Sequence, residues 1–115
     1  MSPRPVDPDA AGLLARVAEL LTPPGAWDRD ARGTRGPSWN LIGALYKVLL
    51  DYRYSSEVWG DAIYLLVKAL RARADAGPLA ERAYAMPSLK RFNDESATVD
   101  RVLELLAEAR KAAPS

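Results

Sequence analysis

The segment from Ser55 to about Ala76 constrains the fold most, because it has helical character and is apolar on almost every side. Its apolar side chains are Val58, Trp59, Ala62, Ile63, Leu65, Leu66, Val67, Ala69 and Leu70. Ser55 or Ser56 would be the N-cap, and Glu57 would stand in the favourable first turn. A helix with so little polar surface must be covered by neighbours on most sides. The sequence therefore predicts a central helix with other elements packed around it.

Three further segments show the apolar spacing of amphipathic helices. One follows Asp9, a plausible N-cap, and ends at residues 22–25; another starts at Pro37-Ser38 and runs to about Asp51; the last follows Thr98, which would be its N-cap. No stretch alternates β-branched residues as a strand would. A chain of 115 residues with 49% hydrophobic residues has the size of one domain. We therefore expect an all-α fold, a compact bundle of four to five helices around the central apolar third helix.

The expected domain spans residues 9–113, after a flexible proline-rich tail at residues 1–8. Gly43 and Gly60 are expected to permit close approach of helices. A short fourth helix is expected over residues 79–85, followed by a break at Met86-Pro87-Ser88. Residues 22–37 form a long connection, which indicates either a functional loop or poor order.

The ten residues DYRYSSEVWG, 51–60, combine aromatic rings, charges and hydroxyls. We interpret them as the corner between the second and third helices. Tyr52 would close the apolar face of the second helix. Arg53 and Tyr54 have no evident structural role in this interpretation.

Two absences limit the chemistry. The chain has no cysteine and no histidine, so thiolate catalysis, thiolate metal sites and a Ser-His-Asp arrangement are excluded. No glycine-rich phosphate loop or metal-ligand spacing is evident either. We therefore expect no catalytic residues, no metal site and no cofactor, and we lean towards a protein that is not an enzyme.

The charge and hydropathy of the chain indicate whether a membrane or nucleic acid is an expected partner. The formal net charge is +1, and no apolar run approaches the roughly 20 residues that span a bilayer. The N-terminal sequence lacks the apolar core of a signal peptide. These features predict a soluble cytoplasmic protein without a membrane partner. Arginines at 29, 32 and 35 and basic residues between 71 and 91 could contact phosphates, but interleaved acids make nucleic acid a minority option.

Four motifs carry a resemblance to a known family. They are TPPGAW at 22–27, RDARG at 29–33, SWNLIGALYK at 38–47 and RFNDESATVDRVLELLAEA at 91–109. Together they resemble a family of small actinobacterial and phage helical proteins classed as a domain of unknown function. The chain departs from that family's pattern at Asn40, where relatives carry cysteine, and in a shorter loop after Trp27. The resemblance implies a helical fold and supplies no mechanism.

Asn93 and Asp94 form the sharpest local constellation. They precede the helix capped by Thr98, whose exposed N–H groups could bind a small anionic or carbonyl ligand. The structural alternative is that both side chains tie down a turn while Phe92 fills the core, and we favour it.

Trp27, Trp39 and Asn40 form a second candidate site at the start of the second helix. The two indoles could line a pocket for an apolar-aromatic ligand, with Asn40 as a polar anchor. The alternative, which we favour, is that the tryptophans clamp the long loop onto the core.

Asp61, Tyr64 and Lys68 lie on the narrow polar stripe of the third helix. If neighbours covered the stripe, these groups would suit a small enzyme or isomerase-like pocket. We favour a stripe that faces water. The preferred function is a non-catalytic binding or interaction protein for a protein partner or small ligand at Trp27, Trp39, Asn40, Asn93 and Asp94. A homodimer is a further possibility.

Overall fold

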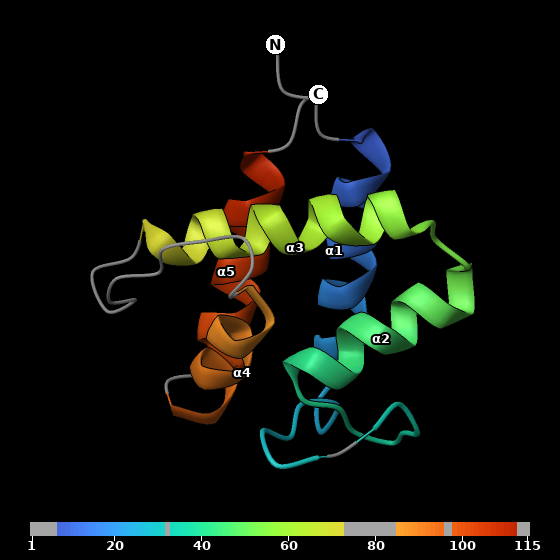
Figure 1. Ribbon diagram of the computed structural model, residues 1–115. Helices are drawn as coiled ribbons and strands as arrows, with labels where there is room; N and C mark the ends of the chain where they lie inside the picture. The colour runs from blue at the N-terminus through green and yellow to red at the C-terminus, as the bar shows by residue number, and fades with distance from the viewer. Residues whose placement is uncertain (1–6, 32, 73–84, 96–97, 113–115) are drawn as a thin grey trace, which may run out of the picture.

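The computed structural model describes residues 7–31, 33–72, 85–95 and 98–112. Within these ranges the chain forms five helices and no named strand, so the all-α expectation is confirmed. The helices, shown in Figure 1, are α1 (Pro8–Leu21), α2 (Leu41–Tyr52), α3 (Ser56–Arg71), α4 (Ala85–Glu95) and α5 (Val99–Lys111).

The helix α3 crosses α1 and α5, which lie beside one another (Figure 1). It also packs against α4, while α2 packs against α1 and α4. Nine of its sixteen residues are buried, so the apolar segment is central as predicted. Fully buried leucines from every helix meet in one core, including Leu13, Leu45, Leu66, Leu89 and Leu106.

The first helix begins two residues earlier than the sequence indicated. Asp7, not Asp9, is the N-cap, and its side chain accepts a hydrogen bond from the backbone N–H of Asp9 at 2.8 Å. Pro8 occupies the first helical position, where a missing N–H leaves no hydrogen bond unmade. Of the expected tail, Asp7 is thus the cap and Pro8 the first residue of α1, and residues 1–6 lie outside the described residues.

The second helix begins later than predicted. Trp39 is extended and pairs with Trp27 in an isolated parallel bridge, through Trp39 N–H to Ala26 O (2.8 Å) and Asp28 N–H to Trp39 O (3.0 Å). Since residue 39 is held in this pairing, a helix cannot include it. The prediction of a start at Pro37-Ser38 is wrong, and Asn40 is the N-cap.

The corner between α2 and α3 gives Arg53 and Tyr54 the structural roles that the sequence did not indicate. Arg53 ends α2 in the left-handed conformation, with φ of 52°. The Tyr54 hydroxyl accepts a hydrogen bond from Arg16 Nε at 3.1 Å and thereby raises the pKa of that guanidinium. Arg16 also covers the ring of Tyr52 at 3.9 Å. Ser55 is the N-cap of α3 and accepts from Val58 N–H at 3.2 Å.

The polar stripe of α3 divides into a buried and an exposed part. Tyr64 and Lys68 are exposed, but Asp61 is only 2% exposed, and its carboxylate accepts a hydrogen bond from the backbone N–H of Asp7 at 2.8 Å. The expectation of a solvated stripe is wrong for Asp61, because the start of α1 covers it. Gly60 does not mediate close packing as expected, since no other described part of the chain comes within 4 Å of the position that a Cβ would take there.

The helix α4 includes residues that the sequence analysis placed in a break and in a turn. It runs through Pro87, which lies in its first turn, and through Asn93 and Asp94 near its end. Proline is tolerated in a first turn because the N–H groups there have no helical acceptor. Phe92 is buried in the core as expected. The short helix expected at residues 79–85 lies, up to residue 84, outside the described residues.

The helix α5 follows its prediction closely. Thr98 is its N-cap and accepts a hydrogen bond from Arg101 N–H at 3.2 Å, and Asp100 stands in the first turn. Val102, Leu106 and Ala109 are buried, together with Leu105.

Candidate functional site

Two asparagines fasten the start of α2 to α4. Asn40 Oδ1 accepts a hydrogen bond from Gly43 N–H at 2.7 Å, the usual bond of an N-cap. Asn93 Oδ1, from α4, accepts from Leu41 N–H at 3.0 Å. Two of the N–H groups that a helix start leaves without helical acceptors are thus satisfied, one locally and one across the fold.

The amide of Asn93 also reaches the long loop. Asn93 Nδ2 donates to the carbonyl oxygen of Arg29 at 3.2 Å and to Asp94 Oδ1 at 3.1 Å. Asn93 is 1% exposed, and these part-buried bonds offset the cost of burying its amide. One side chain therefore joins α4, α2 and the loop.

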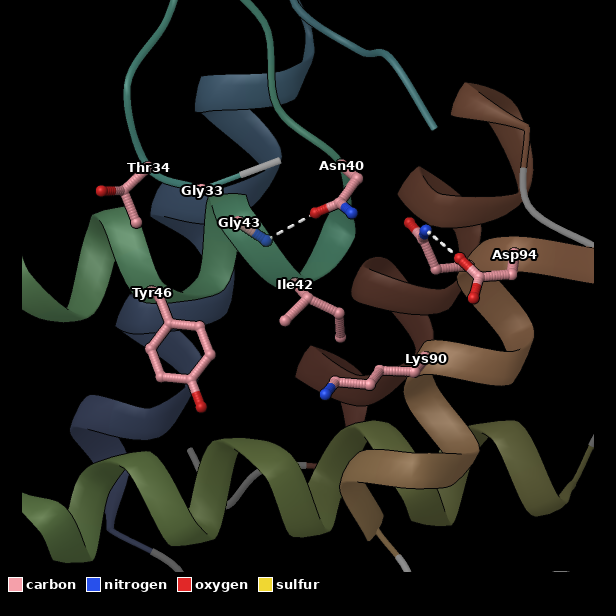
Figure 2. A pocket seen from close by; sticks show the side chains of 9 residues that line it. Gly33, Thr34, Asn40, Ile42, Gly43, Tyr46, Lys90 and Asp94 are labelled. Atoms are coloured by element: carbon pink, nitrogen blue, oxygen red, sulfur yellow. Dashed lines mark hydrogen bonds between the residues drawn. The ribbon is translucent and has the colours of Figure 1, made fainter. Parts of the chain in front are cut away.

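A pocket of about 340 Å³ lies beside this junction, between α2 and α4 (Figure 2). The loop before α2 forms its third side. Its lining residues are Gly33, Thr34, Asn40, Ile42, Gly43, Tyr46, Lys90, Asn93 and Asp94. The volume is at the lower end of what small-molecule sites offer.

The pocket combines one positive and one negative side chain with neutral hydrogen-bonding groups. Figure 2 shows Lys90 extending from α4 towards α2 on the side of Tyr46. Asp94 is held by the hydrogen bond that its Oδ1 accepts from Asn93 Nδ2. The side-chain amide nitrogen of Asn40 is turned towards α4. Among the described residues, no acceptor is hydrogen-bonded to Asn40 Nδ2, although Asn40 is only 8% exposed.

The loop before α2 can approach so closely because Gly43 has no side chain. A Cβ at this position would overlap the carbonyl oxygen of Gly33 and lie 3.2 Å from Asn40 Oδ1. Gly43 thus permits the approach of a loop, where the sequence analysis expected the approach of a helix. Gly33 itself has φ of 75°, a conformation that other residues adopt at a cost.

The structure brings three of the five predicted binding residues into one pocket and leaves two outside it. Asn40, Asn93 and Asp94 line it. Trp27 and Trp39 pack against the core, and Trp39 Nε1 donates to Thr34 O at 3.1 Å. This arrangement fits the clamp interpretation of the tryptophans, because their contacts hold the loop in place.

Sequence reasoning missed the remaining pocket residues, above all Tyr46 and Lys90. Their signal was weak. Lys90 precedes Asp94 by one turn of α4, but the sequence predicted a turn at Asn93-Asp94 and no helix that would bring the two side chains together. Tyr46 stands on α2 outside the apolar face that the periodicity defined, and it is 39% exposed.

The residues of the alternative enzyme hypothesis do not line this pocket. Asp61 is buried, whereas Tyr64 and Lys68 are exposed. Among the described residues, no group of three carboxylates is close enough to hold a metal ion. None of the described helices is both long and apolar enough to cross a membrane.

A shallow hollow marks the outer side of the α2–α3 corner, next to Leu49, Leu50, Tyr54 and Trp59. The rings of Tyr46 and Trp59 pack with centroids 4.9 Å apart. Leu50 is 63% exposed, so this corner has an apolar surface. It contains no buried polar group of the kind that orients a small ligand.

The fold and the pocket define a small all-α domain with a hollow between two of its helices, lined by apolar surface and a few polar groups. The chain belongs to a family of unknown function, DUF6197, whose match covers residues 5–112. Searches of curated proteins and of solved structures found no match. The family therefore supports the expected resemblance, and the residues themselves must carry any functional argument.

Proposed function

We propose that this protein is a non-catalytic binding protein that holds a small molecule in the pocket between α2 and α4. The observation that carries the proposal is the unsatisfied amide nitrogen of Asn40 in that pocket, within the described part of the chain. A buried amide group without a partner is costly, and a bound ligand would supply the missing acceptor.

The composition of the walls supports the same proposal. Ile42 provides apolar surface, and Thr34, Tyr46, Lys90 and Asp94 are the lining residues with hydroxyl or charged groups. Apolar walls with a few polar groups are typical of small-molecule sites. The Asn93 bonds to Leu41 and Arg29 hold these walls together, so the pocket is largely formed before a ligand arrives.

A titration followed by NMR tests the proposal. The ¹⁵N-labelled full chain is titrated with a fragment mixture that contains acids, amines, amides and amino acids. We expect the backbone amide signals of Gly43 and Lys90 to shift at fragment concentrations that leave the amide signals of α5 unchanged. The variant Ile42→Trp fills the pocket and should abolish binding.

The matched control is Leu50→Trp. Leu50 is on the same helix and 63% exposed, and it does not line this pocket. The Leu50→Trp substitution adds the same indole to α2 and should leave fragment binding unchanged. Binding that survives Ile42→Trp, or shifts confined to other surfaces, would contradict the proposed site.

Three alternatives from the sequence stay predictions. The enzyme hypothesis named Asp61, Tyr64 and Lys68 as its candidate residues, and these do not line the pocket. A nucleic-acid role would require binding that weakens steeply with salt. Self-association is tested by light scattering over a concentration series.

A further inference from the structure

The charges of the pocket point to a more specific ligand class. Lys90 and Asp94 are four residues apart on α4, a spacing at which helical side chains can pair. No ion pair joins them in the described structure, and Figure 2 shows Lys90 extending towards α2 instead. Lysine preceding the acid is the less favourable order for such a pair. Both charges are therefore available to a ligand.

The donors of the pocket suit a carboxylate. Asn40 Nδ2 must be the donor end of its amide, because the other end accepts from the backbone N–H of Gly43. Lys90 adds an ammonium group, which can only donate. A negatively charged ligand oxygen would satisfy the buried amide, and the ammonium group of Lys90, on the Tyr46 side of the same pocket, would attract that negative charge.

The acceptor side suits an ammonium group. Asp94 Oδ1 accepts from Asn93 Nδ2 at 3.1 Å, which leaves Oδ2 for a ligand. This carboxylate would repel a simple anion, and Lys90 would repel a simple cation. The two formal charges cancel, so the ligand that matches them carries one charge of each sign.

We propose that the pocket binds a zwitterion of the α-amino-acid type with an apolar side chain. Its carboxylate is recognised by Asn40 and Lys90, its ammonium group by Asp94, and its side chain packs against Ile42 and Tyr46. This inference rests on the proposed function, because it specifies the ligand of the same pocket.

Four compounds that share a phenylethyl body separate the two charges. Phenylalanine carries both, 3-phenylpropionate only the negative one, phenethylamine only the positive one, and 3-phenylpropanamide neither. Titrations of the ¹⁵N-labelled full chain should show phenylalanine binding best. Loss of either charge should weaken binding by about threefold to tenfold, because Lys90 and Asp94 are partly solvated.

Charge-neutralising variants assign each contact. Lys90→Gln should weaken the binding of phenylalanine and of 3-phenylpropionate. It should leave the binding of phenethylamine no weaker, since the lysine charge that repels this cation is removed. Asp94→Asn should weaken the binding of phenylalanine and of phenethylamine, and should leave the binding of 3-phenylpropionate no weaker. Lys68→Gln and Asp51→Asn make the same changes at exposed positions outside the pocket and should alter none of the affinities.

Two kinds of result would overturn the inference. The first is that the positive charge of the ligand does not matter, seen as equal binding of 3-phenylpropionate and phenylalanine, or as a preference for phenylalanine over 3-phenylpropionate that persists in Asp94→Asn. The second is no binding by any of the four compounds. Neither result decides the proposed function, because the fragment titration and the Ile42→Trp variant show separately whether the pocket binds other molecules.

Discussion

Asn93 Oδ1 in α4 accepts a hydrogen bond from the backbone N–H of Leu41, the first residue of α2, at 3.0 Å. The two residues are 52 positions apart in the chain. A helix start is usually capped by residues just before it, and here a second asparagine from another helix adds to that cap. The wall of the candidate pocket depends on this bond.

The first prediction concerns this cross-fold cap. Asn93→Ala should lower the free energy of unfolding by about 1–3 kcal/mol, because the buried N–H of Leu41 and the carbonyl of Arg29 lose their partners. Urea unfolding followed by circular dichroism measures the change. Glu108→Ala removes an exposed side chain from α5 and should stay within about 0.5 kcal/mol of the parent. A similar small effect for Asn93→Ala would show that the cap contributes little.

The second prediction compares two glycines inside helices. Gly43→Ala should destabilise the protein by about 1–3 kcal/mol, because the new methyl group overlaps the carbonyl of Gly33. Gly60→Ala meets nothing within 4 Å and should stabilise it by about 0.5–1 kcal/mol, the usual gain of alanine in a helix. Thermal unfolding of the two variants should therefore shift in opposite directions. Equal shifts would contradict the close approach of the loop to Gly43.

The third prediction concerns the end of α2. Arg53 has φ of 52°, a conformation that costs a residue with a Cβ about 1–2 kcal/mol. Arg53→Gly relieves that cost but makes the unfolded chain more flexible, so we expect a net gain of up to about 1 kcal/mol. Arg53→Val should be less stable than the parent, since a β-branched residue tolerates this conformation poorly. Differential scanning calorimetry gives the order, and an unstable Arg53→Gly variant would indicate that the arginine side chain matters more than the backbone.

The fourth prediction separates a structural from a catalytic role of Asp61. Asp61→Ala should lose about 1–3 kcal/mol of stability, because the carboxylate that accepts from Asp7 N–H is buried. It should leave ligand binding in the α2–α4 pocket unchanged. Lys68→Ala, two turns further along the same stripe of α3 and exposed, serves as the control and should change neither property. Chemical denaturation and the fragment titration provide the two measurements.

Much of the fold could be predicted because helix periodicity and capping are local properties. Ser55 and Thr98 cap their helices by bonding backbone groups three residues away, as the sequence indicated. Asn40 was misplaced by the same reasoning, because its position as a cap depends on Trp39 being held by Trp27. The pairing of Trp27 with Trp39 cannot be predicted from the pattern of neighbouring residues.

The candidate site could be predicted only in part. Asn40, Asn93 and Asp94 were identified from their residue types, but the interpretation of Asn93-Asp94 as a turn was wrong. Lys90 and Tyr46 carry no local signal, since a lysine and a tyrosine on helix surfaces are common. They become notable only because α4 and α2 lie on either side of one hollow.

The sequence by itself determined the helical class, the central position of α3 and the cap of α5 at Thr98, because apolar periodicity and short-range hydrogen bonds depend on neighbouring residues. The tertiary structure decided which polar groups are buried. Asp61 meets Asp7 across 54 positions, and Asn93 meets Leu41 across 52. Whether these polar groups are buried, and which groups they bond, depends on how the helices pack. For the same reason, only the folded chain places Asn40, Lys90 and Asp94 around one pocket.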